Sequence, residues 1–135
     1  MLDLQSRLKL EGGDILFELT REQVEKSYNG IGSASMPNII RWTLTELNPS
    51  FVLPAVIHDC MWDYFCDGSD DDFFASNEAF ENNCNTCINE FYAIYNPARY
   101  FYRLNASKYK YLLDHFGKGA YLAATKKAVE NPPPM

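Results

Sequence analysis

The residues best suited to chemistry in this sequence are the adjacent pair His58 and Asp59. An imidazole accepts a proton near neutral pH, and a carboxylate is a ligand for hard metal ions, so the pair predicts base and metal-ligand chemistry. Trp62 and Phe65 follow the histidine at helical steps, which predicts a helix over residues 54–66. A histidine inside such an apolar stripe is costly to bury unless it has a partner.

A second, longer helix offers that partner. Apolar residues recur at steps of three or four over residues 73–94, which predicts a buried helix face that ends near Asn96 and Pro97. Asn77 lies within this stripe, and a buried amide needs hydrogen-bond partners. If the two helices pack antiparallel, Asn77 can hold His58.

Four pieces of this sequence occur in an order that resembles a known family. They are a Gly-rich loop ending in Ala-Ser-Met-Pro, the His-Asp element, the Asn-Glu-Ala-Phe turn of the second helix, and a closing His-Phe-Gly segment, at residues 30–37, 55–59, 77–80 and 115–121. Over residues 28–124 the chain resembles an uncharacterised family encoded by phages and prophages, a domain of unknown function with a phospholipase A2-like His-Asp helix motif.

The resemblance implies both a fold and a set of site residues. The expected fold is mainly α, with an antiparallel helix-pair core like that of the phospholipases A2. By resemblance, His58 is the general base that activates water, Asp59 binds calcium, and Asn77 holds the orienting position. The backbone carbonyls implied to complete the calcium site are those of Tyr28, Gly30 and Gly32.

Three features depart from the phospholipase pattern. The orienting residue is Asn77 rather than an aspartate, and an amide does not stabilise an imidazolium as a carboxylate does. Trp62 stands where those enzymes carry a supporting tyrosine, and it donates only through its N–H. The stretch between Gly32 and His58 is also longer. These departures favour a scaffold whose site is catalytically silent.

The sequence therefore supports three functional hypotheses. The favoured one is a phage or prophage protein that uses an inactive phospholipase-like scaffold as a virion or assembly component, with other protein chains as partners. The second is a calcium-dependent phospholipid esterase that aids membrane passage or lysis. The third is a small host-directed inhibitor or binding protein, to which the acidic composition is suited.

The expected organisation is a single domain over residues 1–135. Residues alternate on either side of Gly12-Gly13, which predicts a small β-hairpin, and Thr20 with Gln23 predicts a capping box at a short helix, all within residues 1–27. The helical core follows over residues 28–124. Further helices are expected over residues 38–47, 98–104, 107–116 and 119–129, and residues 130–135 form a Pro-rich tail.

The four cysteines leave three alternatives open. Cys60, Cys66, Cys84 and Cys87 can be free core thiols, disulfides or zinc ligands. Free thiols are favoured, because a cytoplasmic chain keeps its thiols reduced and because the Cys84-x-x-Cys87 pair lies inside a helical pattern.

The composition of the chain limits the classes of partner that it is expected to bind. The chain has 135 residues and a formal net charge of −6, which disfavours nucleic acid and anionic membrane surfaces as partners. It shows neither the apolar segment of a signal peptide at its start nor a run of ~20 apolar residues, so no integral membrane association is expected. The expected location is the bacterial host cytoplasm or a virion assembled there.

Overall fold

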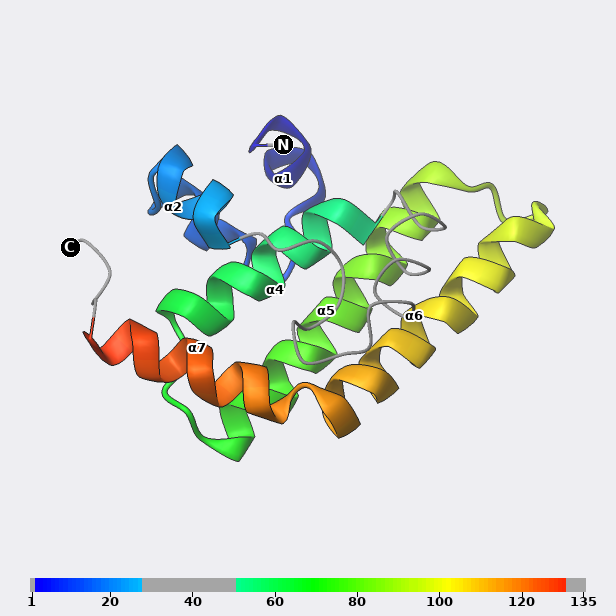
Figure 1. The fold of residues 1–135 in the computed structure, drawn as a ribbon. Coiled ribbons are helices and arrows are strands. Elements are labelled where there is room, and N and C mark those ends of the chain that lie inside the picture. The colour runs from blue at the N-terminus through cyan, green and yellow to red at the C-terminus, as the bar shows by residue number, and fades with distance from the viewer. Residues whose placement is uncertain (1, 28–50, 131–135) are drawn as a thin grey trace.

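The computed structural model describes residues 2–27 and 51–130, and this part of the chain is mainly helical, as the sequence predicts (Figure 1). The N-terminal elements are α1 (Leu2–Leu8), the 3₁₀-helix η1 (Gly13–Phe17) and α2 (Arg21–Ser27). The elements after the gap are α4 (Val52–Tyr64), α5 (Asp70–Phe91), α6 (Pro97–Phe116) and α7 (Lys118–Glu130).

The helices α4, α5 and α6 form an up-and-down row with α5 in the middle (Figure 1). Trp62 near the end of α4 donates a hydrogen bond to Ser76 near the start of α5. The two helices therefore run antiparallel. Helix α6 runs back along the other side of α5, and α7 turns across to pack on α4. The antiparallel helix pair that the His-Asp motif predicts is therefore present.

The core between these helices is aromatic. Trp62, Phe73 and Tyr121 bring three helices together, with ring centroids 5.0 to 5.9 Å apart. Burying aromatic rings of this size supplies much of the apolar stabilisation available to a chain of this length. A second cluster joins α4 to the N-terminal elements through Leu16, Ile57 and their neighbours.

The two longest helices, α5 and α6, each begin at a polar cap. Ser69 precedes α5 and accepts a hydrogen bond from the backbone N–H of Asp72 at 3.2 Å. Its first turn holds three aspartates, whose negative charges suit the positive end of the helix dipole. Asn96 caps α6 through Ala98, directly before Pro97. Asn96 and Pro97 lie where the sequence predicts a helix boundary, whereas α5 begins three residues before the predicted start at residue 73.

One helix replaces two predicted ones after Pro97. The sequence suggests separate helices over residues 98–104 and 107–116, but α6 is continuous. The reason is packing. Tyr102, before the expected break, packs against the same cluster as the buried Ala106, Tyr109 and Leu113, so one stripe crosses the break and the polar residues there do not interrupt the helix.

The predicted N-terminal hairpin is wrong for the described residues 2–27, which fold as α1, η1 and α2. The alternation around Gly12-Gly13 would place Phe17 inward and Leu16 outward, yet Phe17 is 54% exposed and Leu16 only 3%. Gly12, with φ 72°, does make the predicted turn, but between two helical segments. Short apolar runs fit both the period of a strand and the period of a helix. In this region the contacts of η1 and α2 with α4 favour the helical form.

The capping box at α2 is confirmed. The side chain of Gln23 accepts from the backbone N–H of Thr20 at 2.8 Å, and the Thr20 hydroxyl accepts from the N–H of Gln23 at 3.2 Å. The predicted helix over residues 38–47 lies wholly outside the described residues. Of the predicted Pro-rich tail over residues 130–135, only residue 130 is described.

Candidate functional site

His58 lies in the middle of α4 and faces α5. Only 4% of the residue is exposed. Its ring stands 4.3 Å from that of Trp62 and 5.4 Å from that of Phe80, measured between centroids. An imidazole enclosed in this way needs its nitrogens to find partners within the protein, since few water molecules can reach it.

Asn77 provides the first partner. Its Oδ1 lies 2.8 Å from His58 Nε2, and the asparagine itself is fully buried. The antiparallel packing of α4 and α5 thus joins the two polar residues that interrupt the two predicted apolar stripes. This is the pairing expected from the sequence.

The next partner, Asp114 on α6, was not predicted. The Asn77 side-chain nitrogen Nδ2 donates to Asp114 Oδ1 at 2.8 Å. Lys110, one turn earlier on α6, donates to Asp114 Oδ2 at 2.7 Å. The result is a continuous chain of hydrogen bonds from α4 through α5 to α6.

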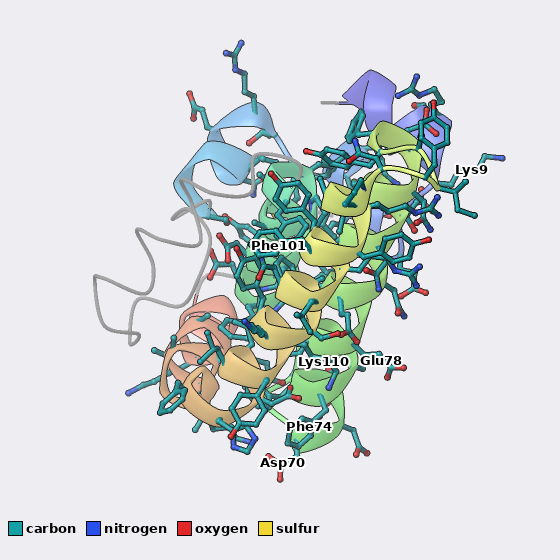
Figure 2. All side chains as sticks on the ribbon, turned by 90° about the vertical axis from the view of Figure 1, so that its right-hand side faces the viewer. Lys9, Asp70, Phe74, Glu78, Phe101 and Lys110 are labelled. Atoms are coloured by element: carbon teal, nitrogen blue, oxygen red, sulfur yellow. The ribbon has the colours of Figure 1, made fainter. Side chains whose placement is uncertain are left out.

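This chain of contacts ends at the seam between α5 and α6. Lys110 lies beside Glu78 of α5 at that seam (Figure 2). The hydrogen bond to Asp114 is the main factor that raises the pKa of Lys110, and the nearby glutamates add to it. The network therefore runs from a buried imidazole to a partly exposed ammonium group.

A sequence signal for Asp114 exists, but it is weak. Lys110 and Asp114 are four residues apart, the spacing of a helical ion pair. Such pairs usually lie on exposed surfaces, so the spacing alone does not connect them with Asn77, which is 37 residues away. Only the packing of α6 on α5 makes that connection.

Asp59, the predicted calcium ligand, lies on the other side of the imidazole. Its Oδ1 is 3.9 Å from His58 Nδ1, and 17% of its side chain is exposed. The other predicted ligands, Tyr28, Gly30 and Gly32, lie outside the described residues. Within residues 2–27 and 51–130, no group of three or more His, Cys, Asp and Glu side chains is placed to hold a metal ion.

Helix α7 fixes the α4–α5 corner beside the site. The Tyr121 hydroxyl donates to the backbone carbonyl of Ser69 at 2.8 Å and accepts from the N–H of Gly68 at 3.1 Å. Burial is the main cause that raises the pKa of Tyr121, to about 12, so its hydroxyl keeps its proton. Trp62 donates to Ser76 at 2.8 Å, which holds the indole ring against His58.

The four cysteines are free thiols in the structure, the alternative favoured by the sequence. Burial is the main cause that raises the pKa of the Cys60 thiol to about 12 and the pKa of the Cys87 thiol to about 11. It also raises the pKa of the Cys84 thiol well above the ordinary value. These thiols are neutral at physiological pH, which makes them poor nucleophiles and places them with the core.

Comparisons with known proteins give no family for this chain. No family model, no curated protein and no solved structure matches it. Among the helices that the structure describes, none combines the length and apolarity needed to cross a membrane. The feature of the described residues that bears on function is the site itself, where a buried imidazole has one nitrogen held by an amide and the other facing a carboxylate.

Proposed function

We propose that this chain is a hydrolase of the phospholipase A2 type, with His58 as its general base and a phospholipid ester as its substrate. The observation that carries the proposal is the hydrogen bond between His58 Nε2 and Asn77 Oδ1, at 2.8 Å. It occupies one ring nitrogen and leaves Nδ1, on the side of Asp59, to take a proton.

The chemistry is ester hydrolysis. Nδ1 of His58 removes a proton from a water molecule while the water oxygen bonds to the ester carbonyl carbon. The resulting imidazolium returns that proton to the leaving alkoxide as the carbon–oxygen bond breaks, which releases a fatty acid and a lysophospholipid. Asn77 keeps the ring oriented through both transfers, since Nε2 stays hydrogen-bonded to it.

Calcium enters the proposal through the resemblance to phospholipases A2. Bound by Asp59 and the carbonyls of Tyr28, Gly30 and Gly32, it would stabilise negative charge on the ester oxygen. The oxygen donors suit calcium, but Asp59 is the only one of the four among the described residues. The same resemblance supports a phage or prophage origin and a role in membrane passage or lysis.

The test is fatty-acid release from vesicles that mix zwitterionic and anionic phospholipids, in calcium and in chelator. We expect calcium-dependent release by the wild-type protein and its loss in His58→Ala. The exposed histidine of α6 gives a matched control, so His115→Ala should keep full activity. Folding of each variant is checked by circular dichroism. No release by folded wild-type protein in either condition would contradict the proposal.

Two observations favour a second function, an inactive scaffold in a virion or another assembly. His58 is 4% exposed, which restricts the access of water and substrate. Large apolar side chains are also at least half exposed along α6, at the end of α5 and in the turn between them, a feature typical of interaction surfaces. They are Phe91, Ile94, Tyr95, Tyr100, Phe101, Leu104, Tyr111 and Phe116, and Phe101 stands out from α6 in Figure 2.

If the chain is an inactive scaffold, its function should not depend on His58. The chain should be found in purified particles of the phage that encodes it, and His58→Ala should assemble there as well as wild type. A host-directed binding protein would use the same apolar surface, but nothing in the described residues indicates a target. That hypothesis stays a prediction.

A further inference from the structure

We infer that Asp114 is the positioning carboxylate of this site and that it acts on His58 through Asn77. The inference deepens the proposed function and rests on it for its catalytic meaning. It assigns a role to a residue that the His-Asp motif does not include. It also offers a reason why an asparagine can occupy the position that carries an aspartate in phospholipases A2.

The donors and acceptors around Asn77 fix the orientation of its amide. An ionised carboxylate only accepts hydrogen bonds, and Asp114 already accepts one from Lys110 at 2.7 Å. The amide end of Asn77 that lies 2.8 Å from Asp114 must therefore be its NH₂ group. An asparagine fixed at its nitrogen has its oxygen fixed too, and that oxygen faces His58.

The tautomer of His58 follows from this. Asn77 Oδ1 accepts hydrogen bonds and has no proton to give, so the bond at 2.8 Å requires a proton on His58 Nε2. In the neutral ring Nδ1 then carries the lone pair. It faces Asp59 at 3.9 Å, where a second carboxylate cannot donate to it. Asp114 thus determines, across one intervening amide, which nitrogen of His58 acts as the base.

The carboxylate also supplies charge. Asp114 accepts from Asn77 Nδ2 at 2.8 Å, and this hydrogen bond polarises the amide whose oxygen faces His58. Lys110 moderates this effect because it already neutralises part of the Asp114 charge. Asp114 is therefore a positioning residue that acts through Asn77, and its loss should lower activity by less than the loss of His58.

The experiment reads the tautomer directly. Nitrogen NMR of protein labelled with ¹⁵N-histidine distinguishes protonated from unprotonated ring nitrogens, and His58→Ala assigns the signals against His115. Wild type should show a single tautomer with the proton on Nε2. Lys110→Gln should keep that tautomer, because the carboxylate remains. The double variant Lys110→Gln/Asp114→Asn removes the carboxylate without leaving an unpaired lysine charge.

In the double variant an amide faces Asn77, so either end of the Asn77 side chain can face His58. We expect both tautomers in slow or intermediate exchange and a fall in hydrolysis of about 10- to 100-fold, the range seen when supporting partners are removed. Adding Asn77→Asp to this double variant should restore the Nε2–H tautomer, because an acceptor again faces the ring. Asp71→Asn, which removes an equal charge from the exposed start of α5, should change neither the tautomer of His58 nor the rate of hydrolysis.

Two results would overturn the inference. One is a proton on Nδ1 of neutral His58 in the wild-type protein. The other is an unchanged Nε2–H tautomer in the folded Lys110→Gln/Asp114→Asn variant. Neither depends on activity, so an inactive wild-type protein with the expected tautomers would remove the proposed hydrolase function and leave the role of Asp114 in fixing the ring intact.

Discussion

Two buried asparagines of α5 use the same side chain in different ways. Asn77, fully buried, joins His58 to Asp114 and so connects three helices through side chains. Asn83 is 1% exposed and pairs with backbone instead: its Oδ1 accepts from the N–H of Glu11 at 2.7 Å, and its Nδ2 donates to the carbonyl of Glu11 at 2.9 Å.

The difference separates a site from a structural attachment. Both asparagines satisfy their amide at both ends, as burial requires. The partners of Asn77 can gain or lose protons, so its network can take part in chemistry. The partner of Asn83 is a peptide group, which cannot titrate, so its two bonds only dock the segment after α1 on α5. Changes at the two positions should therefore have separable effects.

The largest effect is expected for Asn77→Leu. The substitution leaves the buried His58 Nε2 and one oxygen of the partly buried Asp114 without partners, which should lower the free energy of unfolding by about 2–4 kcal/mol. Urea denaturation measures this change. Fatty-acid release should also be lost. A variant as stable as wild type would mean that the network contributes nothing to folding.

A smaller loss is expected for Asn83→Ala, about 1–3 kcal/mol, because the backbone N–H and C=O of Glu11 lose their partner but lie near solvent. Hydrogen exchange should become faster in α1 and η1, while the NMR signals of His58 stay unchanged. If those signals moved as they do in Asn77→Leu, the two regions would not be independent.

Alkaline pH should weaken the apolar cluster that joins α4 to the N-terminal elements, because Cys60 and Cys87 both belong to it. Folding raises the pKa of Cys60 to about 12 and that of Cys87 to about 11 from an ordinary value of 9.0, mainly through burial. The native state then holds protons that the unfolded state loses, so stability is intact below pH 9 and falls as pH rises from 9 towards 12. Thermal melts across this range test the sign, and Cys60→Ala should flatten the decline.

The smallest effect is expected for Arg7→Ala. Arg7 and Glu90 form an ion pair at 3.4 Å with side chains 59% and 41% exposed. Solvent screens such pairs, so the free energy of unfolding should change by less than about 0.5 kcal/mol. A loss as large as that of Asn83→Ala would show that this pair, rather than the Asn83 amide, holds the N-terminal segment.

The sequence by itself determined the helices with strong local signals. The capping box at Thr20, the helix boundary at Asn96 and Pro97, and the long apolar stripe of α5 each involve residues a few positions apart, whose contacts depend little on the rest of the chain. It also indicated the pairing of His58 with Asn77, since each is a polar residue within an apolar face.

Only the tertiary structure decided the rest. Residues 7–19 fit either a strand or a helix period, and in the structure they form the end of α1 and the 3₁₀-helix η1, which packs against α4, instead of a hairpin. Asp114 joined the site because α6 packs on α5 and brings it to a residue 37 positions earlier. Sequence spacing carries no information about such contacts, since the energy that selects them comes from burying whole helix faces together.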